Sequence, residues 1–348
     1  MPEALSLPVG FARRMVDWQR RQGRQHLPWQ HTRDPYRVWL SEIMLQQTQV
    51  STVLDYYPRF LQRFPDVASL AAAPGDDVLA LWSGLGYYSR ARHLHRCAQE
   101  VVARFGGDFP RTAEQLLTLP GIGRSTAAAI AAFCFDQRAA ILDGNVKRVL
   151  SRVLGYGADL AMAASERELW ALADRLLPEQ AADMPAYTQS LMDLGATVCQ
   201  PRKVQCEACP VQGVCVAHQQ GQPLAYPVKT RKLKRSSATL WLLWAVGPKG
   251  QVWLHRRPPR GIWAGLFSLP VFDDEASLLA ACPAARAVQH IEPWKHVLTH
   301  RDLHLHPVRL QLGHRAAPLC DGQWVDAGDW PALGLPAPVR LLLSGQNA

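Results

Sequence analysis

An unbroken series of helix-like segments over residues 10–218 is the feature that most limits what this chain can fold into. Apolar residues recur at helical spacing along 34–64, and no strand-like alternation interrupts the pattern further on. Asp66, Asp76 and Thr112 are placed to cap helices, and Gly or Pro lies in the gaps. The pattern predicts an all-α domain.

The pattern changes after a basic segment, KTRKLKR, at 229–235. Whether this segment is a solvated linker or a tether that contacts phosphates, it marks a domain boundary. Beyond it, three stretches rich in branched and aromatic residues are typical of strands, and two others are helix-like. The strands are expected at 238–246, 250–258 and 300–312, and the helices at 274–285 and 336–345. We therefore expect a helical domain at 1–228, a linker at 229–235 and an α+β domain at 236–348.

The formal net charge of +9 favours a polyanionic partner, because neutralising phosphates releases counterions. No apolar run approaches the roughly 18 residues of a membrane span, and the N-terminal stretch lacks a signal-peptide core. We expect a protein that lies inside the cell.

Four of the eight cysteines fall within seventeen residues, in a C-x6-C-x2-C-x5-C pattern. Inside the cell such clustering indicates a metal rather than disulfides. The candidate ligands are Cys199, Cys206, Cys209 and Cys215. Tetrahedral zinc and a [4Fe–4S] cluster both accept four thiolates, and the spacing alone does not separate them. Arg202 and Lys203 lie in the first loop, where a metal-closed turn would present them to phosphate.

The stretch LPGIGRSTA, residues 119–127, places two glycines between two helical segments. Gly121 and Gly123 can turn the chain sharply and expose their amides, and the helix that follows directs its N-terminal N–H groups toward the same turn. The simpler alternative is a tight turn between packed helices. The preceding Leu-Pro and the basic chain favour a helix-hairpin-helix element that binds the DNA backbone without reading sequence.

Two carboxylates have unlike surroundings. Glu42 lies in an apolar helix, WLSEIMLQQTQV, where burial would raise its pKa and suit a general acid. Asp143 directly precedes a helix in ILDGNVKRVL. The plain alternatives are a solvent-facing Glu42 and an Asp143 that only caps the helix. Two such carboxylates flanking a glycosidic bond could divide the acid and stabiliser roles.

Together these segments resemble the adenine-DNA glycosylase (MutY) family of the helix-hairpin-helix superfamily. The motifs that carry the resemblance occur in order: LPWQ, VWLSEIMLQQTQV, LWSGLGYYSRAR, LPGIGRSTA, ILDGNVKRVL, MDLGATVC and the cysteine run. They cover about 10–218 densely, and the C-terminal domain resembles the family's MutT-like (Nudix-like) domain more loosely.

The resemblance implies a [4Fe–4S] cluster on the four cysteines and removal of adenine mispaired with 8-oxoguanine, or less efficiently with guanine. It implies that Glu42 protonates the adenine ring. Asp143 would stabilise the oxocarbenium-like sugar, in part through a transient covalent adduct that water resolves, and Asn145 would support Asp143.

The resemblance also implies a bacterial enzyme that is monomeric and lies in the cytoplasm, associated with the nucleoid. It further implies which residues hold the duplex DNA. Gln47 and Tyr87 would wedge into the base stack as the adenine flips out, with Thr48 beside them on the DNA. The residues expected to line the adenine pocket are Trp29, Gln30 and Gln189. Lys147 would contact a phosphate or occasionally trap the abasic sugar.

Ser125 occupies the hairpin position at which bifunctional relatives of the endonuclease III type carry a lysine. Such a lysine attacks the sugar and forms a Schiff base, which a serine cannot do. The sequence therefore predicts base removal without efficient strand cleavage. The alternatives are a bifunctional glycosylase/lyase and a catalytically silent iron–sulfur protein that binds DNA.

The second domain lacks the R-E-x-x-E-E helix with which a Nudix hydrolase holds magnesium. We therefore expect a binding domain that recognises 8-oxoguanine. The family's Phe-Ser-His loop aligns with Leu298, Thr299 and His300, which keep the hydroxyl and the imidazole but not the aromatic ring.

Overall fold

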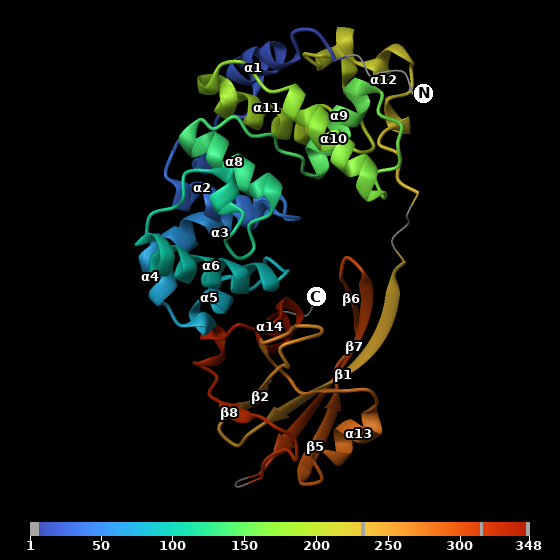
Figure 1. Ribbon diagram of the computed structural model, residues 1–348. Helices are drawn as coiled ribbons and strands as arrows, with labels where there is room; N and C mark the ends of the chain where they lie inside the picture. Colours follow the sequence, from blue (N-terminus) through green and yellow to red (C-terminus); the bar gives the residue numbers. More distant parts are fainter. Residues whose placement is uncertain (1–6, 231–233, 314–315, 346–348) are drawn as a thin grey trace. The chain divides into compact units, whose positions relative to one another are not determined.

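The computed structural model describes residues 7–230, 234–313 and 316–345 (Figure 1). Part of the basic segment expected to be a linker, at 231–233, lies outside the described residues. Within the described ranges, no helix is both long and apolar enough to cross a membrane.

The chain divides into two compact units. The first comprises the described residues of 1–71 and 96–232, and the second comprises those of 72–95 and 233–348.

The first unit is helical, as predicted. The helices that lie wholly or partly in it are α1 (Phe11–Gln22), α2 (Pro35–Leu45), α3 (Val50–Arg63), α4 (Val67–Ala72), α6 (Ser89–Phe105), α7 (Ala113–Leu116), α8 (Arg124–Phe135), α9 (Gly144–Leu154), α10 (Ala163–Arg175), α11 (Met184–Thr197) and α12 (Val216–Gln219). The side chain of Asp66 accepts from the Ser69 N–H at 2.7 Å, and that of Thr112 accepts from the Gln115 N–H at 3.3 Å, so both cap helices as predicted. The prediction for Asp76 is wrong, because the helix there, α5 (Gly75–Leu81), has Pro74 at its N-cap.

The centre of the first unit is built around α8 and α11. The alanines of α8, from Ala127 to Ala132, are buried. Such small side chains let helices approach closely, and α2 and α11 both pack against α8. Helix α11 also packs against α1 and α9. These contacts bring together helices that are far apart in the sequence.

The second unit contains a mixed sheet. Its strands are β1 (Ser236–Val246), β2 (Val252–Arg256), β3 (Phe267–Ser268), β4 (Val271–Phe272), β5 (Ala285–His290), β6 (Trp294–Val297), β7 (Arg301–Leu312) and β8 (Gln323–Val325). The two long strands β1 and β7 run parallel, and their shorter neighbours pair with them antiparallel (Figure 1). Helix α13 (Glu275–Ala280) packs on β1 and β4, and α14 (Ala337–Leu343) follows later in the chain. The predicted strands and helices are confirmed.

Residues 72–95 belong to this second unit although they interrupt the helical part of the sequence. The Ser83 hydroxyl donates to the Leu335 carbonyl at 2.7 Å, and the Tyr88 hydroxyl donates to the same oxygen at 3.1 Å. Arg92 Nη1 donates to the Ala264 carbonyl at 2.6 Å. Side-chain bonds to backbone carbonyls thus attach this segment to the C-terminal part of the chain.

Candidate functional site

A cavity of about 1040 Å³ lies within the first unit, between α2, α8, α9 and α11. Nine residues that the sequence singled out line it: Trp29, Gln30, Glu42, Gln47, Thr48, Ser125, Asp143, Asn145 and Gln189. They come from segments spread over 160 positions, since Trp29 and Gln189 are that far apart. Packing of the four helices, together with the turn at 28–30 and the loop between α2 and α3, therefore assembles the site.

Glu42 is held on α2, whose start is fixed by the Asp34 side chain accepting from the Tyr36 N–H at 2.9 Å. Its neighbours Ile43 and Met44 are buried. Removal of the carboxyl from water raises the pKa of Glu42 to about 8, and the nearby charge of Asp143 adds to the rise. Glu42 therefore carries a proton at neutral pH, as a general acid must.

Asp143 is the N-cap of α9, and its Oδ1 accepts from the Val146 N–H at 2.8 Å. Burial raises its pKa above the usual value. Hydrogen bonds from the N–H groups of Val146 and Asn145, and the charge of Arg148, act in the opposite direction. Asp143 therefore caps α9, as the plainer alternative expected, and the same side chain also lines the cavity.

Asn145 is fixed by Arg148, a residue that the sequence did not single out. Arg148 Nη2 donates to Asn145 Oδ1 at 2.8 Å and to the Gly195 carbonyl at 2.7 Å, and its Nε donates to the Cys199 carbonyl at 2.8 Å. A Cβ on Gly195 would lie 2.7 Å from Asn145 Cβ, so the glycine allows α9 and α11 to approach. The only feature of the sequence that indicates this contact is the spacing of Asn145 and Arg148, because residues three apart on a helix are neighbours.

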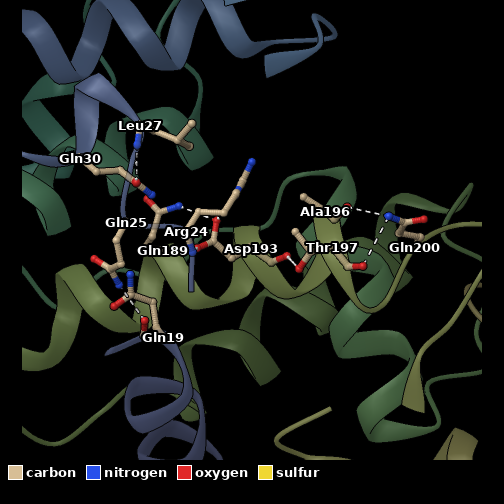
Figure 2. A network of polar contacts seen from close by, with 10 residues as sticks. All are labelled: Gln19, Arg24, Gln25, Leu27, Gln30, Gln189, Asp193, Ala196, Thr197 and Gln200. Atoms are coloured by element: carbon tan, nitrogen blue, oxygen red, sulfur yellow. Dashed lines mark hydrogen bonds and ion pairs between the residues drawn. The ribbon is translucent and has the colours of Figure 1, made fainter. Parts of the chain in front are cut away.

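Trp29 and Gln30 lie in a short 3₁₀ turn, Pro28–Gln30. The Trp29 ring packs edge-on against Tyr57, with centroids 5.4 Å apart. Gln30 Oε1 accepts from the Leu27 N–H at 3.2 Å. Gln189, on α11, donates from Nε2 to Asp193 Oδ1 at 2.8 Å (Figure 2).

Ser125 Oγ accepts from the Leu142 N–H at 3.1 Å. The hydroxyl thereby steadies the backbone immediately before Asp143. Gln47 and Thr48 lie in the loop between α2 and α3, and Gln47 has a φ of 56°. That angle is unusual for a side chain with a Cβ, and such strained residues cluster at ligand-binding sites.

The glycine turn lies outside the cavity. Gly121 has a φ of 77°, and Gly123 is the N-cap of α8. Both glycines are exposed. Lys147 also does not line the cavity, and its Nζ pairs with Glu166 Oε1 at 2.7 Å.

The four clustered cysteines line a second, small cavity of about 20 Å³. Arg152 is buried beside them, and its Nη1 lies 3.2 Å from Cys199 Sγ. As the thiols are placed, no group of three or more His, Cys, Asp or Glu among the described residues forms a metal-binding set. The four thiols nonetheless line one shared cavity, as the ligands of a single bound group would. Arg202 and Lys203 are exposed in the loop between Cys199 and Cys206.

The remaining predicted residues lie in the second unit. Leu298, Thr299 and His300 form the turn between β6 and β7, closed by a hydrogen bond from the Leu298 N–H to the Arg301 carbonyl at 2.8 Å. Thr299 and His300 are exposed. The Tyr87 hydroxyl hydrogen-bonds the Thr299 hydroxyl, and Tyr87 has a φ of 47°. Arg235 donates to the carbonyls of Leu298 and Thr299, each at 3.0 Å.

Comparison with solved structures shows a shared fold for the helical part. A thermostable thymine-DNA glycosylase is 29% identical with a TM-score of 0.54, covering 60% of this chain and 95% of its own. An endonuclease III in a non-covalent complex with DNA has a TM-score of 0.51 at 19% identity, covering 60% of this chain and 94% of its own.

Comparison with known sequences covers both domains. Residues 40–175 match the HhH-GPD superfamily of base excision DNA repair proteins, and residues 241–345 match the NUDIX domain. An adenine DNA glycosylase of Rattus norvegicus is 47% identical over 232 residues, 63% of this chain and 44% of the relative. An adenine DNA glycosylase of Buchnera aphidicola subsp. Schizaphis graminum (strain Sg) is 33% identical over 341 residues, 96% of this chain and 97% of the relative. Because that similarity extends over nearly the whole of both sequences, the chain belongs to the adenine DNA glycosylase family, with a helix-hairpin-helix base-excision repair domain followed by a NUDIX domain.

Proposed function

We propose that this enzyme extrudes adenine mispaired with 8-oxoguanine, or with guanine, from duplex DNA and hydrolyses its N-glycosyl bond, leaving an abasic site in an uncut strand. The observation that carries the proposal is one cavity lined by two carboxyl groups with unlike environments, Glu42 and Asp143. A single-turnover assay on such a duplex, which measures free adenine and strand integrity separately, tests it.

Glu42 is the proton donor. Protonation of the adenine ring allows the base to leave with the electron pair of the broken glycosidic bond. A carboxyl whose pKa lies near 8 is protonated when substrate binds at neutral pH, and an ordinary carboxylate is not.

Asp143 stabilises the sugar cation that remains at C1′. Its carboxylate bonds to C1′ for a short time, and water then displaces it to give the abasic sugar. The N-cap hydrogen bond from Val146 fixes the carboxylate in place, and Asn145, held by Arg148, is proposed to support Asp143, to which its backbone N–H also donates.

Trp29, Gln30 and Gln189 line the same cavity and would enclose the extruded base. Gln47, with Thr48 beside it, and Tyr87 are proposed to fill the gap left in the stack. The left-handed backbone at Gln47 and Tyr87 supports this role, since such strain is retained where function requires it.

The exposed glycine turn at Gly121 and Gly123 is proposed to bind the DNA backbone, as are Arg202, Lys203 and Lys147. Lys147 must leave Glu166 to do so.

Ser125 should make the enzyme monofunctional. It cannot form a Schiff base, and its hydroxyl is already occupied with the Leu142 N–H. We expect free adenine to appear while the product strand stays intact until it is treated with heat or alkali. Borohydride should trap no protein–DNA adduct at the rate of base loss. Strand breaks that form as fast as adenine is released would contradict this and favour the bifunctional alternative.

The four clustered cysteines are proposed to hold a [4Fe–4S] cluster, which the family typically binds. When bound, the cluster supplies no chemical step and closes the loop that carries Arg202 and Lys203. We expect purified protein to absorb visible light and to contain four iron and four sulfide per chain. Cys206→Ser should lose the absorption, whereas Cys282→Ser, a buried cysteine of the second unit, should keep it. Colourless protein containing zinc would refute the assignment.

The C-terminal domain is proposed to recognise 8-oxoguanine through the turn that carries Thr299 and His300. Both side chains are exposed at the turn, and Arg235 holds its carbonyls. Thr299→Ala together with His300→Ala should reduce the preference for adenine opposite 8-oxoguanine over guanine by about tenfold, the effect of one or two hydrogen bonds. Excision opposite guanine should change little. His290→Ala, an exposed histidine on β5, is the matched control. An unchanged preference would mean that another loop reads the lesion.

We further propose that the enzyme works as a monomer in the cytoplasm, on nucleoid DNA. The domain organisation proposed is a glycosylase domain at 1–228, a linker at 229–235 and a lesion-recognition domain at 236–348. The third alternative, a silent iron–sulfur protein that binds DNA, predicts no adenine release at all in the single-turnover assay.

A further inference from the structure

Asp193 is a charged group set behind the wall of the cavity. It lies one helical turn after Gln189 on α11, and its side chain is fully buried. Figure 2 shows Arg24 and Gln189 meeting at its carboxylate. The Arg24 N–H donates to Oδ2 at 2.9 Å, Arg24 Nε donates to Oδ1 at 2.7 Å, and Gln189 Nε2 donates to Oδ1 at 2.8 Å.

The pairing fixes which way the Gln189 amide points. A carboxylate paired with a guanidinium only accepts hydrogen bonds, so only the NH₂ end of Gln189 can face it. The amide oxygen, Oε1, must then be the end left for a ligand in the cavity that Gln189 lines. Asp193 thereby makes Gln189 a hydrogen-bond acceptor toward the cavity.

Gln30 is oriented in the opposite sense by the same logic. Its Oε1 accepts from the backbone N–H of Leu27, which can only donate. Its Nε2 is buried without a hydrogen-bond partner among the described residues. A buried donor left unpaired is costly, and this one lines the cavity, where a bound base or a water can accept from it. The two glutamines that line the cavity are therefore oriented in opposite ways. Gln189 has its amide oxygen free to accept a hydrogen bond, and Gln30 has its NH₂ group free to donate one.

We propose that Asp193 is a positioning residue that selects 6-amino over 6-oxo purines by locking the amide of Gln189. This inference rests on the proposed function, since it concerns the base that the cavity receives. A purine with an exocyclic amino group donates to Gln189 Oε1. A purine with a carbonyl at that position directs lone pairs at the same oxygen and is rejected, which a rotatable amide would not enforce.

The test compares single-turnover rates on two duplexes that differ only in carrying adenine or hypoxanthine at one position. The ratio of the two rates is measured for wild type and for Asp193→Ala, so that the intrinsic difference between the two leaving groups cancels. We expect Asp193→Ala to lower the adenine-to-hypoxanthine ratio by about tenfold, because the released amide can turn its NH₂ end to the 6-oxo group. Asp193→Asn keeps one oxygen that can accept from Gln189 and should restore much of the ratio.

Asp183→Ala is the control, since Asp183 also pairs with an arginine, Arg20, at 2.6 Å, but in a more exposed ion pair that does not line the cavity. It should leave the ratio unchanged. If Asp193→Ala does not fold, Arg24→Met with Asp193→Leu removes both charges and frees the amide without leaving a guanidinium unpaired. Equal slowing of both substrates, with the ratio kept, would overturn the proposal and leave Asp193 a purely structural residue. Failure of wild type to release adenine would instead refute the proposed function.

Discussion

Replacing Glu42 with Gln should slow the single-turnover release of adenine by about a thousandfold, within the range that a positioned general acid contributes. The substitution keeps the size of the side chain and removes only the transferable proton. Binding of duplex DNA should be nearly unchanged, because Glu42 lies in the cavity and is not expected to contact phosphate. Rates of adenine release with enzyme in excess, together with DNA affinity, check this.

The stability of the same variant separates a chemical effect from unfolding. Burial raises the pKa of Glu42 from 4.5 to about 8 in the folded protein. Between these two pH values the carboxyl group ionises in the unfolded state but stays protonated in the folded state, so wild type loses stability as the pH rises through this range. Gln does not titrate, and Glu42→Gln should therefore unfold at a higher temperature than wild type at pH 8. Glu179→Gln, at an exposed glutamate between α10 and α11, is a control that should change neither property. Wild-type speed from folded Glu42→Gln would remove Glu42 from the mechanism.

Asp143→Asn should slow adenine release by about a hundredfold to a thousandfold, the loss expected when charge stabilisation at the sugar cation is removed. Asn caps helices as well as Asp does, so α9 should keep its start at Gly144. Thermal unfolding should change little, while the rate collapses. Single-turnover rates and circular dichroism provide the two measurements.

The matched control for this variant is Asp274→Asn. Asp274 caps α13 in the same manner, accepting from the Ser277 N–H at 2.7 Å, but lies in the second unit. Both variants keep a cap, and only Asp143→Asn should lose activity. Equal activity of the two would mean that Asp143 does no more than cap its helix.

The sequence predicts the residues that line the cavity better than the residues that hold those side chains in place. Glu42 and Asp143 could be singled out because a carboxyl group is conspicuous in an apolar helix or directly before a helix, and Gln189 was named through the family resemblance. Arg148 and Asp193 could not be singled out, because each acts through partners distant in the chain, such as Cys199 for Arg148 and Arg24 for Asp193. A charged residue on a helix reads as solvent-facing until the packing that buries it is known.

The same limit applies to the second unit. The long strands β1 and β7 are rich in branched and aromatic residues and were predicted, whereas β5 and β6 were not. Strand β5 is mostly exposed, so it carries no buried alternation to detect. The attachment of residues 72–95 to this unit includes hydrogen bonds from Ser83, Tyr88 and Arg92 to backbone carbonyls far away in the sequence, and no local sequence pattern predicts such contacts.

The pH dependence of single-turnover adenine release by wild type tests most directly whether a buried carboxylic acid delivers the proton. With enzyme in excess and DNA binding saturated at each pH, the rate should be steady near neutrality and fall with an apparent pKa of about 8 as Glu42 ionises. A rate that stays constant from pH 7 to well above 9, with the protein folded throughout, would contradict the account.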